Sequence, residues 1–177
     1  MKEIVAKTLK FYFEKMRAPE VSELQLSDTS LMDERACFFV TLFLNGEVHG
    51  SAGNVKEIEE NAIKEIIQNT ISAVSKDKRF APLTLEQSEK LWFRVDKIIS
   101  RNIIHSADIK KLDPVKNGII CIKRDYEKLA VLLPNITPSL LTWEDMIPVI
   151  QNKLSEKSID DKNFIVYQIE TLSETSF

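Results

Sequence analysis

The amino-acid sequence predicts an α+β fold in which an antiparallel or mixed sheet is flanked by helices. Two long stretches, residues 2–16 and 54–75, place apolar side chains at helical spacing. Two hairpin signals, Asn45-Gly46 and residues 124–127, separate stretches with the composition of strands. Hairpins join antiparallel strands, whereas each parallel pair needs a long crossover. This mixture therefore favours α+β over a doubly wound parallel sheet.

Apolar periodicity and turn signals place the elements along the chain. Helices are expected where apolar side chains recur three or four residues apart, and strands where they run continuously or alternate. The expected order is helix 2–16, connection 17–35, strands 36–44 and 47–52, helix 54–75, a short helix from Thr84, strand 91–99, loop 100–117 with a weak helical turn, strands 117–123 and 128–133, helix 142–154 and strand 164–172.

Five polar residues mark the starts of the expected helices. Asn54 can accept an N–H bond at the start of the long helix, and Glu57 completes a capping-box spacing. Thr84 and Gln87 repeat this spacing at the start of the short helix. Thr142 can cap the last helix in the same way.

Size and composition limit the class of protein. The chain has 177 residues, 44% hydrophobic and 29% charged, which predicts one domain over residues 1–177. Its net charge of −3 argues against nucleic acid as a partner. The longest strong apolar run, residues 37–44, is too short to span a membrane, and the N-terminus lacks the apolar core of a signal peptide. We therefore expect a cytoplasmic protein with no nucleic-acid or membrane partner.

The chain is poor in the residues that metals and common cofactors need. It has two histidines and two cysteines, none at metal-ligand spacing, so we expect no metal site. It has neither a Walker sequence nor a G-x-G-x-x-G fingerprint, so we expect no cofactor. Cys37 and Cys121 lie in apolar runs, which is typical of buried, reduced cysteines.

Three of the four glycines fall within the stretch NGEVHGSAGN. Gly50 and Gly53 flank Ser51 just before the helix expected from Asn54. The first N–H groups of a helix are unpaired and partly positive, and glycines let a ligand approach the backbone closely. His49 and Ser51 would add hydrogen-bonding groups. The alternative is structural, with a bulge at Gly50 and a positive-φ turn at Gly53.

Asp77 and Arg79 follow the expected end of the long helix. The Arg79 guanidinium could hold a carboxylate or phosphate through two parallel hydrogen bonds. Alternatively, both side chains satisfy backbone groups at the helix end or in the loop. The candidate ligand-binding residues are His49, Gly50, Ser51, Gly53, Asn54, Asp77 and Arg79.

Several stretches together resemble the AMMECR-type domain family. They are FVTLFLNGEVHGSAGN, SAVSKDKRFAPLTLEQSEKL, NGIICI, VLLP and Trp143, in the order and spacing of that family. The resemblance extends from Ile4 to the last strand. It implies an α+β fold with a larger and a smaller lobe, but no settled activity. Because related bacterial and archaeal domains occur beside Memo-type proteins and radical-SAM enzymes, it also implies such proteins as partners.

The family's most characteristic motif, leucine-arginine-glycine-cysteine-x-glycine, corresponds to residues 48–53. Both glycines are present, but His49 stands in place of the arginine and Ser51 in place of the cysteine. The family's aspartate-x-arginine-phenylalanine-x-proline stretch is matched fully, from Asp77 to Pro82. The two exchanges remove a fixed positive charge and a thiol. A serine hydroxyl is a poor nucleophile without a paired base.

Three hypotheses about function follow. The first is that the chain binds a small molecule or a partner peptide at the Gly50–Asn54 turn, with Asp77 and Arg79 lining the site. The second is an enzyme in which Ser51 or a backbone anion site performs acyl- or phosphoryl-type chemistry, which requires a general base near Ser51. The third is a non-enzymatic adaptor, which an exposed apolar patch away from the turn would favour.

Overall fold

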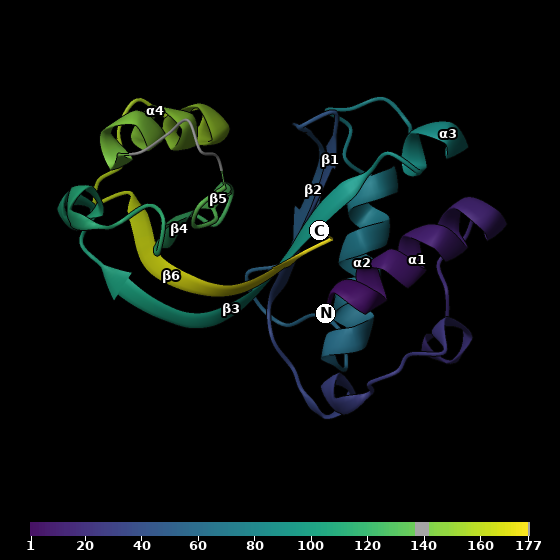
Figure 1. Ribbon diagram of the computed structural model, residues 1–177. Helices are drawn as coiled ribbons and strands as arrows, with labels where there is room; N and C mark the ends of the chain where they lie inside the picture. Colours follow the sequence, from purple (N-terminus) through teal and green to yellow (C-terminus); the bar gives the residue numbers. More distant parts are fainter. Residues whose placement is uncertain (137–141, 177) are drawn as a thin grey trace. The chain divides into compact units, whose positions relative to one another are not determined.

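The computed structural model describes residues 1–136 and 142–176, and Figure 1 shows the course of the chain. Its α-helices are α1 (Lys2–Lys15), α2 (Ala62–Ser75), α3 (Leu85–Ser88) and α4 (Trp143–Leu154). Its short 3₁₀ helices are η1 (Val21–Leu24), η2 (Ser30–Asp33) and η3 (Ser106–Lys111). Its strands are β1 (Phe38–Leu44), β2 (Glu47–Gly53), β3 (Trp92–Ile104), β4 (Gly118–Lys123), β5 (Leu129–Leu132) and β6 (Phe164–Thr175). No helix within the described residues has the length and apolar character needed to cross a membrane.

The strands are hydrogen-bonded in the order β2-β1-β3-β6-β4-β5. The pairs β1–β2, β1–β3, β4–β5 and β4–β6 are antiparallel, which together with the helices confirms the α+β class. The chain forms two compact units: the first unit is Met1–Lys97 with Ser173–Phe177, and the second unit is Ile98–Leu172. One domain over residues 1–177 stays a prediction.

In the first unit, α1 and α2 lie on one side of strands β1 and β2 (Figure 1). Phe38 and Leu42 point to this side and are buried together with Ile66 of α2. Side chains alternate between the two faces of a strand, so Phe39 and Phe43 point to the other side, where both are also buried. Strand β1 is therefore covered on both faces, as its apolar run predicts.

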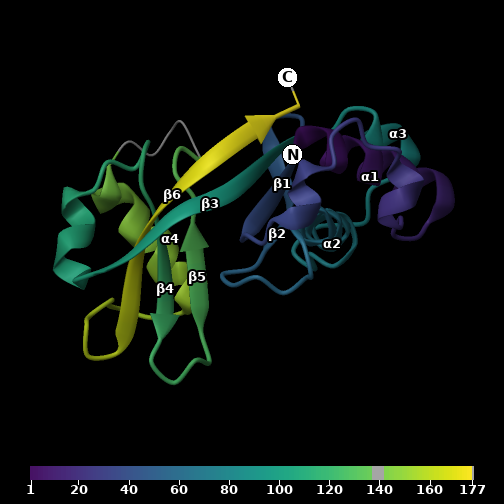
Figure 2. The same ribbon diagram turned by 90° about the horizontal axis from the view of Figure 1, so that it is seen from below.

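In the second unit, α4 packs against the layer formed by β4 and β5 (Figure 2). Trp143 and Ile150 lie on the apolar stripe of α4 and join a core that includes Cys121 of β4. Burial raises the pKa of the Cys121 thiol to about 12, so this cysteine is protonated at neutral pH. Thr142 caps α4, because its hydroxyl accepts the N–H of Asp145 at 3.3 Å.

Two local predictions are confirmed by backbone and side-chain geometry. Asn45 and Gly46 have φ angles of 55° and 84°, the positive values that a type I′ hairpin turn requires. Thr84 caps α3 by accepting the N–H of Gln87, whose side chain accepts the N–H of Thr84 in return. Both features depend only on neighbouring residues.

The predicted start of α2 is wrong. The helix begins at Ala62 instead of following Asn54, and Asn61 is its N-cap, accepting the N–H of Lys64 at 3.0 Å. Asn54 donates its side-chain amide to Glu65 at 2.6 Å. Either asparagine could cap a helix, because both side chains carry an oxygen that accepts an N–H. Asn54 instead binds Glu65, and Asn61 forms the cap.

Strand β3 is longer than predicted. Residues 100–104 were expected to lie in a loop, but β3 continues to Ile104 before η3 begins at Ser106. Strand β6 is the neighbour of β3 in the sheet and likewise extends beyond the predicted range, to Thr175. Pairing between strands distant in sequence therefore extended both strands beyond what local pattern indicated.

Candidate functional site

The glycine-rich stretch lies inside strand β2 and not at a strand-to-helix turn. Leu42 of β1 pairs with Gly50, but the next residue of β1, Phe43, pairs with Val48. His49 is therefore an extra residue on β2, which makes a β-bulge. Because α2 begins at Ala62, the predicted helix N-terminus is absent from this stretch.

Gly50 and Gly53 are required by close packing. A Cβ atom on Gly50 would collide with the backbone carbonyl oxygen of Ala73 in α2, and one on Gly53 would collide with the Phe39 ring. The alternative interpretation of the glycines is therefore partly confirmed, since the bulge ends at Gly50. Its second part is wrong, because Gly46 is the one glycine with positive φ in the described chain.

Asn54 lies in the loop before α2, and its side chain is hydrogen-bonded to that helix. Besides its bond to Glu65, its side-chain amide lies 3.3 Å from the Asn69 oxygen. The Glu65 carboxylate is 1% exposed and also accepts the N–H groups of Ile58 and Glu59, at 3.1 and 2.8 Å. Asn54 thus belongs to a buried network that fixes the loop against α2.

Asp77 connects the loop after α2 to the edge of the sheet. Strand β2 is at one end of the strand order, so some of its N–H groups lack a strand partner. The Asp77 carboxylate accepts one of them, the N–H of Ser51, at 3.0 Å. The alternative interpretation expected Asp77 to satisfy backbone groups of the helix end or the loop; Asp77 does accept the loop N–H of Arg79 at 3.3 Å, but it also bonds a strand N–H.

Arg79 binds the same carboxylate. Its Nε and Nη2 atoms lie 2.8 and 2.6 Å from the two Asp77 oxygens, which is the bidentate geometry that the sequence predicted for a ligand. The Arg79 guanidinium, helped by the Ser51 N–H, holds the pKa of the Asp77 carboxyl below its usual range. The Arg79 side chain is 59% exposed, and no hydrogen bond from the described residues engages its Nη1 atom.

A cavity of about 610 Å³ lies beside this ion pair, within the first unit. Its lining combines aromatic and aliphatic side chains with a few polar ones: Tyr12, Phe13, Met16, His49, Ala73, Val74, Ser75, Asp77, Lys78, Phe80, Ala81, Pro82, Leu83 and Leu85. We call it the first cavity. An apolar cavity with a few convergent polar groups is the usual form of a ligand site.

His49 and Arg79 both contact Phe80, which lines the first cavity. The His49 ring lies 5.4 Å from the Phe80 ring, and its Nε2 atom is 3.2 Å from the Ala81 carbonyl oxygen. The Arg79 guanidinium carbon lies 5.3 Å from the Phe80 ring centre, within the range of a cation–π contact. The bulge in β2 therefore directs His49 toward the segment that carries Asp77 and Arg79.

The Ser51 hydroxyl lies 3.2 Å from the Thr41 hydroxyl on the neighbouring strand. The Asp77 carboxylate accepts the backbone N–H of Ser51 and is not hydrogen-bonded to the Ser51 hydroxyl. Neither contact is a hydrogen bond from Ser51 Oγ to a general base, and the enzyme hypothesis requires one. A catalytic role for Ser51 stays a prediction, since no general base among the described residues is hydrogen-bonded to its hydroxyl.

The structure thus brings together only part of the predicted site. His49 and Asp77 line the first cavity, and Arg79 and Ser51 are bonded to Asp77. Gly50, Gly53 and Asn54 are outside its lining.

Helix α1 contributes to the first cavity, which the sequence did not predict. Tyr12, Phe13 and Met16 belong to the apolar spacing that predicted helix 2–16, and all three line the first cavity, with Met16 72% exposed. The apolar face of α1 continues to its last turn, although its buried residues end at Leu9. The length of this face was the sequence feature that could have indicated an additional surface.

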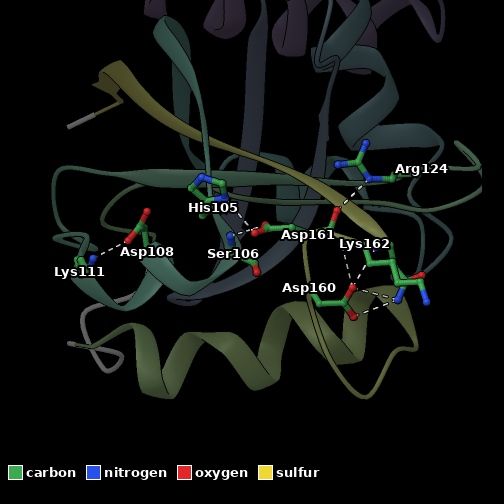
Figure 3. Close-up of polar contacts among 9 residues, drawn as sticks. His105, Ser106, Asp108, Lys111, Arg124, Asp160, Asp161 and Lys162 are labelled. Atoms are coloured by element: carbon green, nitrogen blue, oxygen red, sulfur yellow. Dashed lines mark hydrogen bonds and ion pairs between the residues drawn. The ribbon is translucent and has the colours of Figure 1, made fainter.

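A second group of polar residues lies in the second unit (Figure 3). His105 Nδ1 is 3.0 Å from the Asp161 carboxylate, which also accepts the N–H of Ser106 at 2.7 Å. Arg124 donates to the backbone carbonyl of Asp161 at 3.0 Å, and Asp160 accepts bonds from its neighbours in the same turn. No three His, Cys, Asp or Glu side chains in residues 1–136 and 142–176 are grouped to hold a metal ion.

Comparison with known proteins identifies a family and several related chains. The AMMECR1 family model matches residues 3–171. A Thermotoga maritima protein is 30% identical over 132 residues, covering 74% of this chain and 73% of its own length. A Clostridium acetobutylicum protein is 29% identical over 131 residues; these cover 74% of this chain but 27% of that longer protein.

A solved structure shows the same fold. The crystal structure of an uncharacterised protein from Pyrococcus horikoshii covers 98% of this chain, and 88% of its own chain, with a TM-score of 0.79 at 18% identity. This likeness concerns the fold alone. The family model, in contrast, covers nearly the full sequence. The chain belongs to the AMMECR1 family.

Proposed function

We propose that this chain binds a small molecule or a partner peptide, through an anionic group of the ligand, in the first cavity. The observation that carries the proposal is the position of the Asp77–Arg79 ion pair. Asp77 lines the cavity and fixes Arg79, whose Nη1 edge has no partner among the described residues. A guanidinium held in place by a carboxylate loses little freedom when it binds a ligand.

The charges around the first cavity support an anionic ligand. Lys78 lines the cavity and forms no ion pair within the described residues. Arg79 balances the charge of Asp77, so Lys78 gives the first cavity a net positive charge. Phe80 and Phe13 provide an apolar surface for the remainder of the ligand.

A thermal-shift screen tests the proposal. The full chain is heated with phenylacetate, phenylbutyrate or hexanoate, and in parallel with the alcohol of each compound. A ligand that binds only the folded chain raises the melting temperature with its concentration. We expect at least one carboxylate to raise it and the matched alcohol to raise it less.

Two variants locate the binding. Lys78→Gln and Arg79→Gln should each reduce the carboxylate-dependent shift, whereas Lys56→Gln should leave it unchanged. Lys56 is an exposed lysine of the same unit that is absent from the cavity lining. A shift that survives both cavity variants, or the absence of any shift, contradicts the proposal.

One observation favours the adaptor hypothesis as a second candidate. Ile99 and Ile103 lie on the same face of β3 and are 57% and 70% exposed. Contiguous exposed apolar surface marks protein-binding sites, and two large apolar side chains on one strand face can contribute to such a surface. Binding to the Memo-type or radical-SAM proteins implied by the family would be tested with an Ile103→Ser variant, which should bind such a partner less tightly if this surface is used.

A further inference from the structure

The first cavity adjoins a second one on the other side of Phe13 and Leu85. The second cavity measures about 380 Å³ and also lies within the first unit, between α1 and α3. Phe13 and Leu85 line both cavities, and Leu85 is 62% exposed. The two cavities therefore border the same pair of apolar side chains, and a ligand that covers this pair can enter both.

The combined length suits an extended chain. The lining residues of α1 run from Ala6 in the second cavity to Met16 in the first. At 1.5 Å per helical residue this stretch is about 15 Å long. An extended peptide advances about 3.3 Å per residue, so about five residues would span it.

The two ends differ in charge. Lys78 lines the first cavity, where Arg79 balances Asp77. Glu14 and Glu89 line the second cavity together with Lys10. Neither glutamate takes part in an ion pair within the described residues, and the second cavity has an excess of negative charge.

From these observations we infer that the two cavities are subsites of one groove, which binds an extended peptide segment with an acidic residue at one end, apolar residues in the middle and a basic residue at the other end. The acidic residue would lie near Lys78 and the basic residue near Glu14 and Glu89. The inference rests on the proposed function, since it specifies the ligand of the same site. Charge complementarity along a groove fixes the register of a peptide.

A pool of fluorescein-labelled pentapeptides tests the inference by fluorescence polarisation with the full chain. Each peptide has an acidic residue at one end, three residues chosen from Leu, Phe and Val, and a basic residue at the other end. The acidic residue is N-terminal in half of the peptides and C-terminal in the other half. A second pool replaces both charged residues by glutamine. We expect at least one charged peptide to bind, and its neutral counterpart to bind about tenfold more weakly because two exposed ion pairs are lost.

Charge-reversal variants separate the two ends. Lys78→Glu should weaken binding of the charged peptide about tenfold, because it replaces one exposed ion pair by a repulsion of similar size. It should not affect a peptide whose acidic residue is replaced by glutamine. Glu89→Lys should do the same for the basic end. Lys56→Glu is the matched control and should change neither affinity. The substituted side chains are exposed, so folding of the variants is expected.

The outcomes distinguish this inference from the proposed function. If no pooled peptide binds while a carboxylate still gives a Lys78-dependent thermal shift, the peptide inference is wrong and the proposed function stands. Peptide binding that ignores both charge reversals also overturns the inference. If neither peptide nor carboxylate binds, both are wrong.

Discussion

Asp77 in the first unit and Asp161 in the second unit form similar bonds in different surroundings. Each carboxylate accepts a backbone N–H from a distant segment, that of Ser51 or Ser106, and each holds a side chain that can be cationic, Arg79 or His105. The Asp77 side chain is 8% exposed and that of Asp161 is 48% exposed. Water competes for the bonds of Asp161 far more than for those of Asp77.

The comparison shows that bonding pattern alone does not identify a ligand site. Asp161 joins His105, Ser106 and Arg124 at the surface, and Figure 3 shows that these residues bond to Asp161 itself. The Asp77 group also has a structural role at the edge of β2. It differs because Asp77 lines an apolar cavity where Lys78 has no ion-pair partner in the described residues. The proposed function depends on this difference in surroundings.

The largest expected effects come from the backbone contacts that position β2 and β4. Gly50→Ala places a Cβ atom against the Ala73 carbonyl, and Gly118→Ala places one against the Leu132 carbonyl. Backbone atoms cannot move aside as side chains can, so each change should cost about 3 kcal/mol. Urea unfolding of the variants measures this loss.

Gly53→Ala provides the matched case, because its new Cβ atom meets the Phe39 ring. A ring can rotate or shift, so the expected loss is smaller, about 1–2 kcal/mol. Equal losses at Gly50 and Gly53 would contradict the expectation that a contact with backbone costs more than a contact with a ring.

The Asp77→Asn and Asp161→Asn pair tests the comparison itself. Asparagine keeps the size of the side chain but removes its charge. For Asp77 we expect a loss of about 1–2 kcal/mol, at the lower end for a charged hydrogen bond because Arg79 is partly exposed. For Asp161 the loss should be clearly smaller, because solvent screens its bonds. Both losses are measured in the same urea experiment. A larger loss at Asp161 than at Asp77 would contradict the expectation that the less exposed carboxylate contributes more to stability.

The pH dependence of stability gives a smaller but more specific signal. Arg79 lowers the pKa of Asp77 in the folded chain, so the ionised carboxylate stabilises folding above the unfolded-state carboxyl pKa of about 3.9. This contribution is lost as the pH falls through the lower folded-state pKa. The stability difference between the native chain and Asp77→Asn should therefore be constant near neutral pH and shrink below about pH 4. A difference that grows on acidification would contradict this assignment.

The sequence predicted those features that depend on neighbouring residues. The type I′ turn needs only Asn45-Gly46, and the cap of α3 needs only Thr84 and Gln87. The start of α2 was missed because two asparagines can cap a helix, and the buried contact of Asn54 with Glu65 decides between them. That contact depends on tertiary packing, which periodicity does not reveal.

The candidate site was predicted in part for the same reason. The sequence singled out Ser51 and Asp77, but it could not show that they meet across the edge of β2. Gly50 and Gly53 were interpreted as openings for a ligand, whereas the packed structure fills the space above each of them. The contribution of α1 to the first cavity depends on how that helix lies against the segment after α2, and only the fold supplies this.

Amide chemical shifts of the isotope-labelled full chain, during titration with the carboxylate that gives the largest thermal shift, test the central claim most directly. We predict that the changes concentrate at residues 12–16, 49–51 and 77–85, while the amides of residues 105–108 and 160–163 stay constant. Saturable changes centred on the His105–Asp161 group, or no saturable change in the first unit, would contradict the assignment of the ligand site to the first cavity.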